Sequence, residues 1–258
     1  MQSDFIKEYW EKQARTFGAS HKASWGDNFM IDLETDMIST HISDNDDVLD
    51  AGCGNGYSTM RQYQRHHLKS ITGIDYAENM IAEANKTLTE CKSGNNISFE
   101  TGDIRSLRFK DDSFDVVYTT RVLINLPNWQ EQMQGIGECL RIVRPGGKVV
   151  LCEAFWEPLV LLNSLRLLKQ LPPLVEHDFN RYIKKQKLDE FLNERKLNYK
   201  IDDYSSIYYL GSRFLRELVT DPSQYPDYTN PINEIFYNIE KQFSGGGFGI
   251  QQAYIIVK

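Results

Sequence analysis

The chain has 258 residues, of which 41% are hydrophobic and 25% charged, and its formal net charge is −7 at pH 7. This length and hydrophobic content suffice for one large α/β domain with a single core. The negative charge lacks the basic surplus with which nucleic-acid-binding proteins neutralise phosphates, so we expect no nucleic-acid partner.

The cysteines and the apolar segments point to a reducing, aqueous environment. The four cysteines lie far apart and form no C-x-x-C pair, which predicts neither a zinc site nor a disulfide framework. The first residues do not combine a basic patch with an apolar run, as a signal peptide would. The most apolar tract, 155–175, is broken by charged residues and a proline pair, so we expect no membrane span. These features predict a cytoplasmic protein.

The N-terminal stretch carries aromatic and aliphatic side chains at roughly helical spacing, from Phe5 to Phe17, and then His21 and Trp25. This pattern predicts a helical segment that folds over the domain as a lid. The aromatic residues could instead dock a terminal helix without touching a ligand, and both interpretations can hold together. We name Trp25 as a candidate substrate contact and His21 as the reserve candidate for a general base.

The segment Val48–Gly56 joins a buried-strand pattern to an acid and three glycines at alternate positions. Glycine permits positive φ and lets a ligand approach bare backbone, so the segment predicts a strand followed by a nucleotide-binding turn. The dinucleotide fingerprint G-x-G-x-x-G is missed by one residue, because Tyr57 stands where its third glycine belongs. Asp50 would repel a pyrophosphate and favour an ammonium group, and S-adenosylmethionine carries such a group.

Further strands and helices alternate along the chain up to residue 154. Strands are predicted at 70–75, 97–101, 114–120 and 148–153. Helices are predicted at 57–66 and 128–143, the second with Asn128 as N-cap and Glu131 three positions later. This alternation is typical of a parallel sheet covered on both faces, with ligands bound at the carboxyl ends of the strands.

Polar and aromatic residues follow these strands at the positions that a nucleoside would need. Asp75 ends the second strand, where a carboxylate can accept both ribose hydroxyls. Tyr76 and Met80 follow it and can lie against an adenine ring. Asp103, after the third strand, can accept a hydrogen bond from the adenine amino group. Capping of the next turn or helix is the alternative role for such acids.

A helical insertion at 155–196 contains an apolar helix and then a polar loop. Functional residues concentrate on such loops, because a rigid sheet positions them. His177 is the candidate base, since a neutral imidazole can take a proton near pH 7, and Asp178, Arg181 and Tyr182 are candidate substrate contacts. A structural or solvent-exposed histidine is the alternative, and the apolar helix could equally form a homodimer surface.

The ordered set of motifs resembles the class I S-adenosylmethionine-dependent methyltransferases. The resemblance rests on VLDAGCGNG, GIDYAENM, GDI, FDVVYTTRVLINLP and RPGGKVVLCE, and it covers about residues 45 to 154. It implies a Rossmann-like, doubly wound, seven-stranded α/β sheet whose last strand, at about 250–257, is antiparallel. It also implies S-adenosylmethionine as cofactor and S-adenosylhomocysteine as product.

The same resemblance assigns roles to individual residues. Asp50, Gly52 and Gly54 would hold the methionine end, Asp75 the ribose, and Asp103 with its neighbour the adenine. Arg121, after the fourth strand, would line the site mainly through its backbone. No metal is implied, because that position lacks the acid of the metal-dependent catechol-type enzymes. The full set of expected cofactor contacts is Asp50, Gly52, Cys53, Gly54, Asp75, Tyr76, Met80, Gly102, Asp103, Ile104 and Arg121.

We expect one domain over 1–258, made of an N-terminal helical lid (1–44), a cofactor-binding core (45–154), the helical insertion (155–196) and C-terminal hairpin strands with an insert (197–258). The predicted function is methyl transfer to a small molecule, with oxygen as the favoured acceptor. The SHKASWGD and LINLP stretches also resemble small methyltransferases of bacterial surface-glycan pathways, so a metabolite or a glycan precursor could be the acceptor.

Two alternatives remain open at this point. The first is a non-catalytic regulatory subunit that keeps the cofactor and has lost the transfer. The second is a nicotinamide-dependent oxidoreductase, which the spacing of the glycines disfavours.

Overall fold

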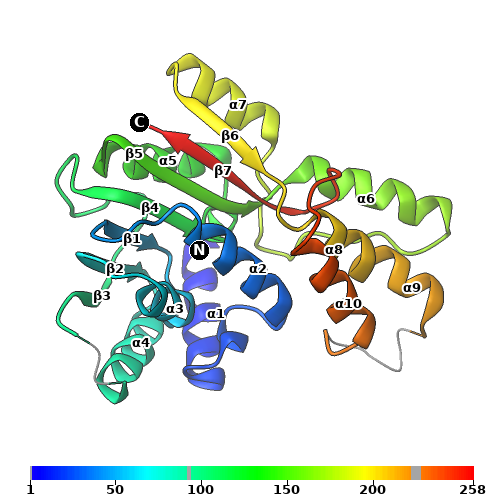
Figure 1. Ribbon diagram of the computed structural model, residues 1–258, viewed down its shortest axis with the longest axis horizontal. Helices are drawn as coiled ribbons and strands as arrows, with labels where there is room; N and C mark the ends of the chain where they lie inside the picture. Colours follow the sequence, from blue (N-terminus) through cyan, green and yellow to red (C-terminus); the bar gives the residue numbers. More distant parts are fainter. Residues whose placement is uncertain (1, 92–93, 222–227) are drawn as a thin grey trace.

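The computed structural model describes residues 2–91, 94–221 and 228–258. Its centre is a seven-stranded sheet with the order β3-β2-β1-β4-β5-β7-β6 (Figure 1). The strands are β1 (Asp47–Ala51), β2 (Ser70–Asp75), β3 (Ile97–Thr101), β4 (Phe114–Thr120), β5 (Val143–Ala154), β6 (Asn198–Asp202) and β7 (Gln251–Val257). β1 to β5 pair in parallel, and β7 runs antiparallel between β5 and β6. The predicted fold class, including the antiparallel last strand, is confirmed.

Apolar runs dominate the central strands because both of their faces are covered, although β1 also contains the acids Asp47 and Asp50. Every residue of β1 is buried, and so are the last six residues of β5. Parallel strands covered on both sides carry such continuous apolar runs instead of an alternating pattern. The strand order reverses between β1 and β4, and ligands bind at this point in open α/β sheets.

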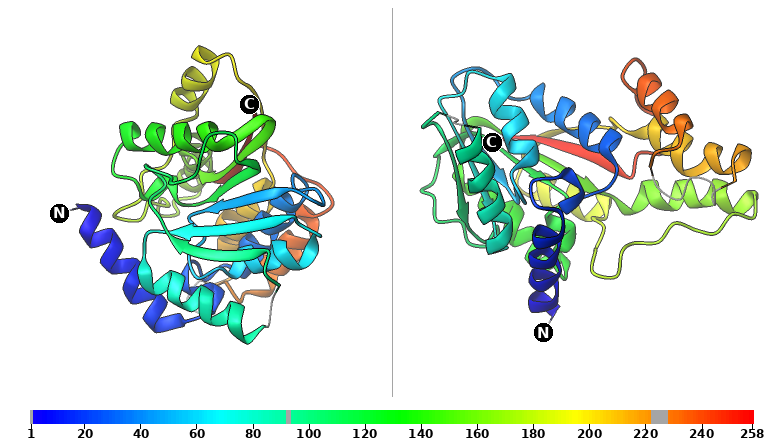
Figure 2. Two further views of the ribbon diagram at one scale, coloured as in Figure 1. Left: turned by 90° about the vertical axis from the view of Figure 1, so that its left-hand side faces the viewer. Right: turned by 90° about the horizontal axis from the view of Figure 1, so that it is seen from below.

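Helices cover both faces of the sheet. One face carries α2 (Asn28–Ser39), α3 (Tyr57–Arg65) and α4 (Glu78–Glu90), and the other carries α5 (Trp129–Ile142) and α7 (Lys185–Glu194), as Figure 2 shows. α5 begins as the sequence predicts, because the side-chain oxygen of Asn128 accepts from the Glu131 N–H at 3.0 Å. Within the described ranges, no helix combines the length and the apolar composition that a bilayer crossing needs.

The remaining helices lie at the carboxyl ends of the strands. α1 (Gln2–Phe17) runs beside α4, and a 3₁₀ turn, η1 (His21–Ala23), follows it. α6 (Trp156–Leu168) projects away from the sheet together with the helices of the chain segment between β6 and β7 (Figure 1). That segment holds α8 (Ser206–Leu210), the π-helix η3 (Gly211–Leu215), α9 (Arg216–Val219) and α10 (Pro231–Glu240). A further 3₁₀ turn, η2 (Leu123–Asn125), follows β4.

Candidate active site

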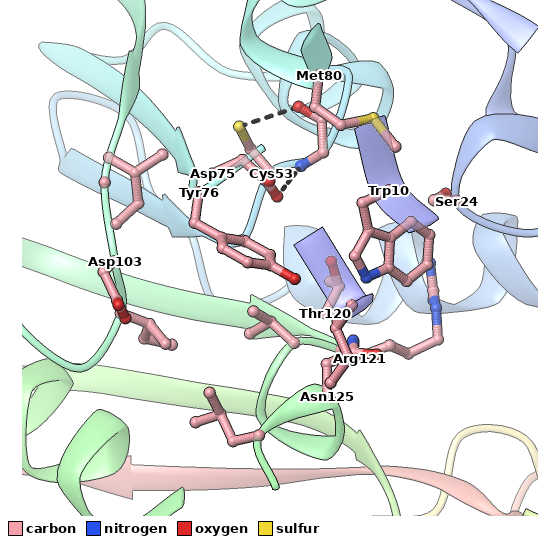
Figure 3. Close-up of a pocket in the computed structure, with 18 of the residues that line it drawn as sticks. Trp10, Ser24, Cys53, Asp75, Tyr76, Met80, Asp103, Thr120, Arg121 and Asn125 are labelled. Atoms are coloured by element: carbon pink, nitrogen blue, oxygen red, sulfur yellow. Dashed lines mark hydrogen bonds between the residues drawn. The ribbon is translucent and has the colours of Figure 1, made fainter. Parts of the chain in front are cut away.

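A cavity opens at the carboxyl ends of β1, β2 and β4, where the strand order reverses (Figure 3). Its walls come from the glycine loop after β1, the segments that follow β2, β3 and β4, and the N-terminal stretch. The lining residues are Ile6, Trp10, Ser24, Gly52, Cys53, Gly54, Asn55, Tyr57, Ser58, Ile74, Asp75, Tyr76, Met80, Gly102, Asp103, Ile104, Arg105, Thr120, Arg121, Val122, Asn125, Leu126 and Pro127.

The three glycines of the loop all have positive φ, but they differ in how closely other side chains pack against them. Gly52 (φ 96°) and Gly56 (φ 76°) are packed so tightly that an added Cβ would lie 2.6 Å from Val122 and 2.7 Å from Phe99. Gly54 (φ 54°) has no heavy atom within 4 Å of such a Cβ. Packing therefore requires glycine at the first and third positions, whereas the middle glycine presents bare backbone to the cavity.

Asp75 connects the glycine loop to the start of α4. Its carboxylate accepts from the Gly54 N–H at 3.0 Å and from the Ala77 N–H at 2.9 Å. Burial raises the pKa of Asp75 to about 6, although these backbone N–H groups favour the ionised form. The side chain lines the cavity, so its remaining acceptor capacity faces the space beside Gly54.

Asp50 lies behind the glycine loop and not in the cavity wall. It is 1% exposed, and its Oδ2 accepts from the hydroxyls of Thr59 (2.6 Å) and Tyr118 (2.9 Å). Its Oδ1 is buried without a partner. Burial raises the pKa of Asp50 to about 7. The structure does not bring Asp50 into direct reach of the cavity, because α3 and β4 enclose the end of the central strand.

The opposite end of the cavity combines apolar surface with one clamped acid. Tyr76 and Met80 both line it, with Ile104 across from them. Asp103 accepts from Arg105 through Nε (2.9 Å) and Nη2 (2.6 Å). Burial would raise the pKa of Asp103, but the hydrogen bonds from Arg105 outweigh it and lower the pKa below its usual value. Asp103 is therefore ionised and held in one orientation.

Arg121 links β4 to the N-terminal stretch. Its backbone is left-handed (φ 56°), a conformation that non-glycine residues rarely adopt and that recurs at functional sites. The guanidinium pairs with the buried carboxylate of Glu34 and lies 4.9 Å from the centre of the Trp25 ring. Figure 3 shows Arg121 and Trp10 beside the same hollow as Tyr76.

Residues 5–27, which we call the N-terminal cover, close one side of the cavity through Ile6, Trp10 and Ser24. The Asn55 side-chain amide holds this cover, because it donates to the carbonyls of Gly18 (2.7 Å) and Ser20 (2.9 Å). A residue inside the glycine loop thus fixes the position of the cover.

The comparisons agree with this geometry. Residues 48–147 match the family model described as a methyltransferase domain. These residues form a methyltransferase domain of the class I S-adenosylmethionine-dependent type. The match covers the region in which the sequence motifs occur, and S-adenosylmethionine is the cofactor of this family.

Several known proteins are similar to this chain in sequence or in fold. It is 32% identical to the 27-O-demethylrifamycin SV methyltransferase of Amycolatopsis mediterranei over 44% of this chain and 40% of the relative. It is 28% identical to a demethylmenaquinone methyltransferase of Leptospira interrogans over 55% of this chain and 57% of the relative. The chain thus spans about half the length of these curated relatives. The solved geranyl diphosphate methyltransferase in complex with S-adenosylmethionine shares the fold, with a TM-score of 0.57, 13% identity and coverage of 86% and 82%.

The cavity of this domain fits the cofactor. Gly54 leaves a bare-backbone cradle that any side chain would fill. Asp75 supplies acceptors beside it, and Tyr76 and Met80 supply the apolar faces that an adenine ring requires. A buried acid without a cationic partner, Asp50, lies directly behind the cradle.

The structure does not bring every expected residue to the cavity. His177 is exposed and packs against Tyr9 and Phe179, with ring centres 5.9 Å and 4.4 Å away. His21 bonds to the carbonyl of Trp25 at 3.0 Å. Besides Asp50, six catalytic and substrate candidates lie outside the cavity lining: His21, Trp25, His177, Asp178, Arg181 and Tyr182.

Contacts outside the cavity explain the positions of two of these six candidates, Trp25 and Arg181. Trp25 reaches it only through Arg121, on whose guanidinium it packs. Arg181 donates to the carbonyls of Asp178 and Asn180 in its own loop.

Across the described ranges, no three His, Cys, Asp or Glu side chains gather where they could hold a metal ion.

Sequence reasoning missed several residues of the cavity wall. Asn55 lies inside the glycine loop, and its side-chain amide was the feature that could have indicated a hydrogen-bonding role there. Arg105 follows Asp103 by two positions and could have been read as its partner. Asn125, in the LINLP motif, lines the cavity with a buried side-chain oxygen that has no partner. The aromatic spacing predicts the N-terminal cover, but which of its residues line the cavity depends on tertiary packing.

Proposed function

We propose that this protein transfers a methyl group from S-adenosylmethionine to a small-molecule acceptor, and that the acceptor atom is oxygen. The observation that carries the proposal is the bare backbone of Gly54 beside the Asp75 carboxylate, inside a cavity that the N-terminal cover closes. Because the curated relatives align over only part of their length, the activity of the whole protein is a proposal.

The cavity residues divide into roles for the cofactor. Gly52 and Gly54 hold its methionine end, Asp75 accepts its ribose hydroxyls, and Asp103 accepts from its adenine amino group. Asp50 contributes negative charge from behind the loop. When bound, S-adenosylmethionine supplies a methyl group on a positively charged sulfur.

The N-terminal cover and the segment after β4 leave the acceptor a small, closed space. Trp10 and Ser24 stand on one side of it, and Arg121 and Asn125 on the other. Such walls exclude water and align the reacting atoms, which supplies much of the acceleration in a displacement reaction. A space bounded by side chains of both segments suits a metabolite and not a polymer.

The cavity wall offers little for general-base catalysis. No histidine occurs among the described residues that line it, and its two carboxylates, Asp75 and Asp103, already accept hydrogen bonds from Gly54, Ala77 and Arg105. We therefore propose an acceptor hydroxyl acidic enough to lose its proton to water. The names of the two relatives refer to small molecules, and one of them specifies an oxygen.

Calorimetry with S-adenosylhomocysteine tests cofactor binding. The wild-type protein should bind, and Asp75→Asn should weaken binding by about 10- to 100-fold, since a charged acceptor of hydroxyl groups contributes about 1.5–3 kcal/mol. Asp111→Asn is the matched control, because Asp111 is a surface acid paired with Arg141. Absence of binding by the wild-type protein would contradict the proposal.

Incubation with labelled donor and a panel of phenols, amines and sugars tests the acceptor. Mass spectrometry and NMR of the product identify the methylated atom. Oxygen is expected. Methylation on carbon or nitrogen would refute the oxygen assignment and retain the methyltransferase, whereas binding without transfer to any acceptor would favour a regulatory subunit.

A further inference from the structure

Glu153 is a completely buried acid near the carboxyl end of β5, next to the cavity but not in its lining. Its Oε1 accepts from the Thr119 hydroxyl (2.8 Å) and from the N–H groups of Val122 and Leu123 (both 3.2 Å). Its Oε2 accepts from the Ile124 N–H at 3.3 Å. One carboxylate therefore holds three successive backbone amides.

Burying a carboxylate at this position costs folding free energy. Glu153 has no cation among its hydrogen-bond partners, and burial raises its pKa to about 7. An aliphatic residue would avoid that cost of burial but would leave the three amide donors without an acceptor. The acid thus exchanges folding stability for a fixed conformation of the turn.

The turn that Glu153 holds forms one wall of the cavity. Val122 lines the cavity and packs against Gly52 so closely that a Cβ there would lie 2.6 Å from the Val122 Cβ. Asn125 ends the turn, lines the cavity, and donates to the carbonyl of Arg121 at 2.6 Å. A shift of the turn would therefore change the distance between this wall and the glycine loop.

We propose that Glu153 is a positioning residue, which holds the 122–124 turn against the glycine loop and so sets the width of the cavity where donor and acceptor meet. The inference rests on the proposed function, because it concerns the shape of the cofactor site. Glu153 acts only through the turn and touches no reacting atom.

Three variants test the inference. Glu153→Gln keeps one oxygen acceptor and places an amide donor opposite one of the four donors, whereas Glu153→Ala removes every acceptor. Thr119→Val is the matched control, because it removes one hydrogen bond from Glu153 and leaves the three backbone amides bonded. Hydrogen exchange of the 121–127 segment in the free protein and calorimetry with S-adenosylhomocysteine are the two measurements.

Exchange in 121–127 should rise in Glu153→Gln and more in Glu153→Ala, with affinity for S-adenosylhomocysteine reduced by about 5-fold and at least about 10-fold. Thr119→Val should lose comparable stability and keep its affinity within about 2-fold. Glu153→Gln decides the matter if Glu153→Ala does not fold.

Two results would overturn the inference: unchanged exchange in Glu153→Gln, or raised exchange with unchanged affinity. Failure of the wild-type protein to bind S-adenosylhomocysteine is a separate result. It would refute the proposed function, and this inference with it, whatever the exchange pattern.

Discussion

The floor and the cover of the cavity are built in different ways. The floor consists of short segments that follow neighbouring parallel strands, and its key contact joins Gly54 to Asp75, 21 positions apart. The cover is one segment, residues 5–27, which contacts with distant parts of the chain hold in place. The floor is therefore determined by local motifs, whereas the cover depends on how separate segments pack.

A buried ion pair joins the N-terminal cover to a residue far along the chain. Asp27, which is completely buried, accepts from the Arg213 guanidinium (2.6 Å) and the Tyr208 hydroxyl (2.7 Å) across 186 and 181 positions. It also caps α2 through the Met30 N–H at 3.2 Å. The helices between β6 and β7 thus hold the N-terminal cover in place, although none of the described residues between those two strands lines the cavity.

The largest expected effect comes from the open glycine of the floor. Gly54→Ala adds a methyl group in the space where ligand approaches, so affinity for S-adenosylhomocysteine should fall about 100-fold in calorimetry. Gly146→Ala is the matched control, because Gly146 also has positive φ (81°) and open space but lies at an exposed position near the start of β5. Equal losses in both variants would mean that backbone strain and not the cavity is responsible.

The buried acid behind the floor should make stability depend on pH. Burial raises the pKa of Asp50 to about 7, so the folded protein keeps a proton that the unfolded chain has already lost between about pH 4 and 7. Its contribution is complete below pH 4 and disappears as pH rises through 7, with a slope of at most about 1.4 kcal/mol per pH unit. Urea unfolding at pH 5, 6, 7 and 8 measures this dependence.

Asp50→Asn removes the titrating group and retains the shape of the side chain. The unfolding free energy of the wild type should fall relative to that of this variant from pH 5 to 7. Above pH 8 the difference between the two should stay constant. A difference that does not change with pH would show that Asp50 is ionised throughout.

The cover should respond to one substitution in the floor. Asn55→Asp replaces the amide that donates to Gly18 and Ser20 by a carboxylate, which repels both carbonyls. Hydrogen exchange of residues 18–25 should rise, and affinity for S-adenosylhomocysteine should fall about 10-fold. Asn128→Asp, at the exposed N-cap of α5, is the control and should change neither. An unaltered cover in Asn55→Asp would mean that its other contacts, such as those of Asp27 with Arg213 and Tyr208, suffice to hold it.

The smallest effect is expected at His177. His177→Ala should leave kcat/KM within about 2-fold of wild type, because the imidazole is exposed and outside the cavity lining. Phe179→Ala serves as comparison, since Phe179 is buried against Tyr9 and Trp10 and should loosen the cover. A loss of kcat of about 100-fold in His177→Ala would instead identify it as a base that reaches the acceptor after a rearrangement.

Most of the floor could be predicted from the sequence. Asp75, Tyr76 and Asp103 follow strands whose boundaries an apolar run reveals, and parallel strands bring their carboxyl ends to one edge. The position of Asp50 could not be predicted in the same way, because the hydroxyls of Thr59 and Tyr118 enclose it only after α3 and β4 have packed. His177 was a plausible base by residue type, but its loop packs against α1 instead of facing the cavity.

By itself, the sequence determined the fold class, the family and the cofactor loop, because glycines, acids and apolar runs at short spacing specify local backbone conformation and strand order. Only the tertiary structure decided which glycine is open, which acid is hidden, and which segments close the cavity. Those features arise from contacts between residues up to 186 positions apart, and such contacts form only when separate helices and the sheet pack together.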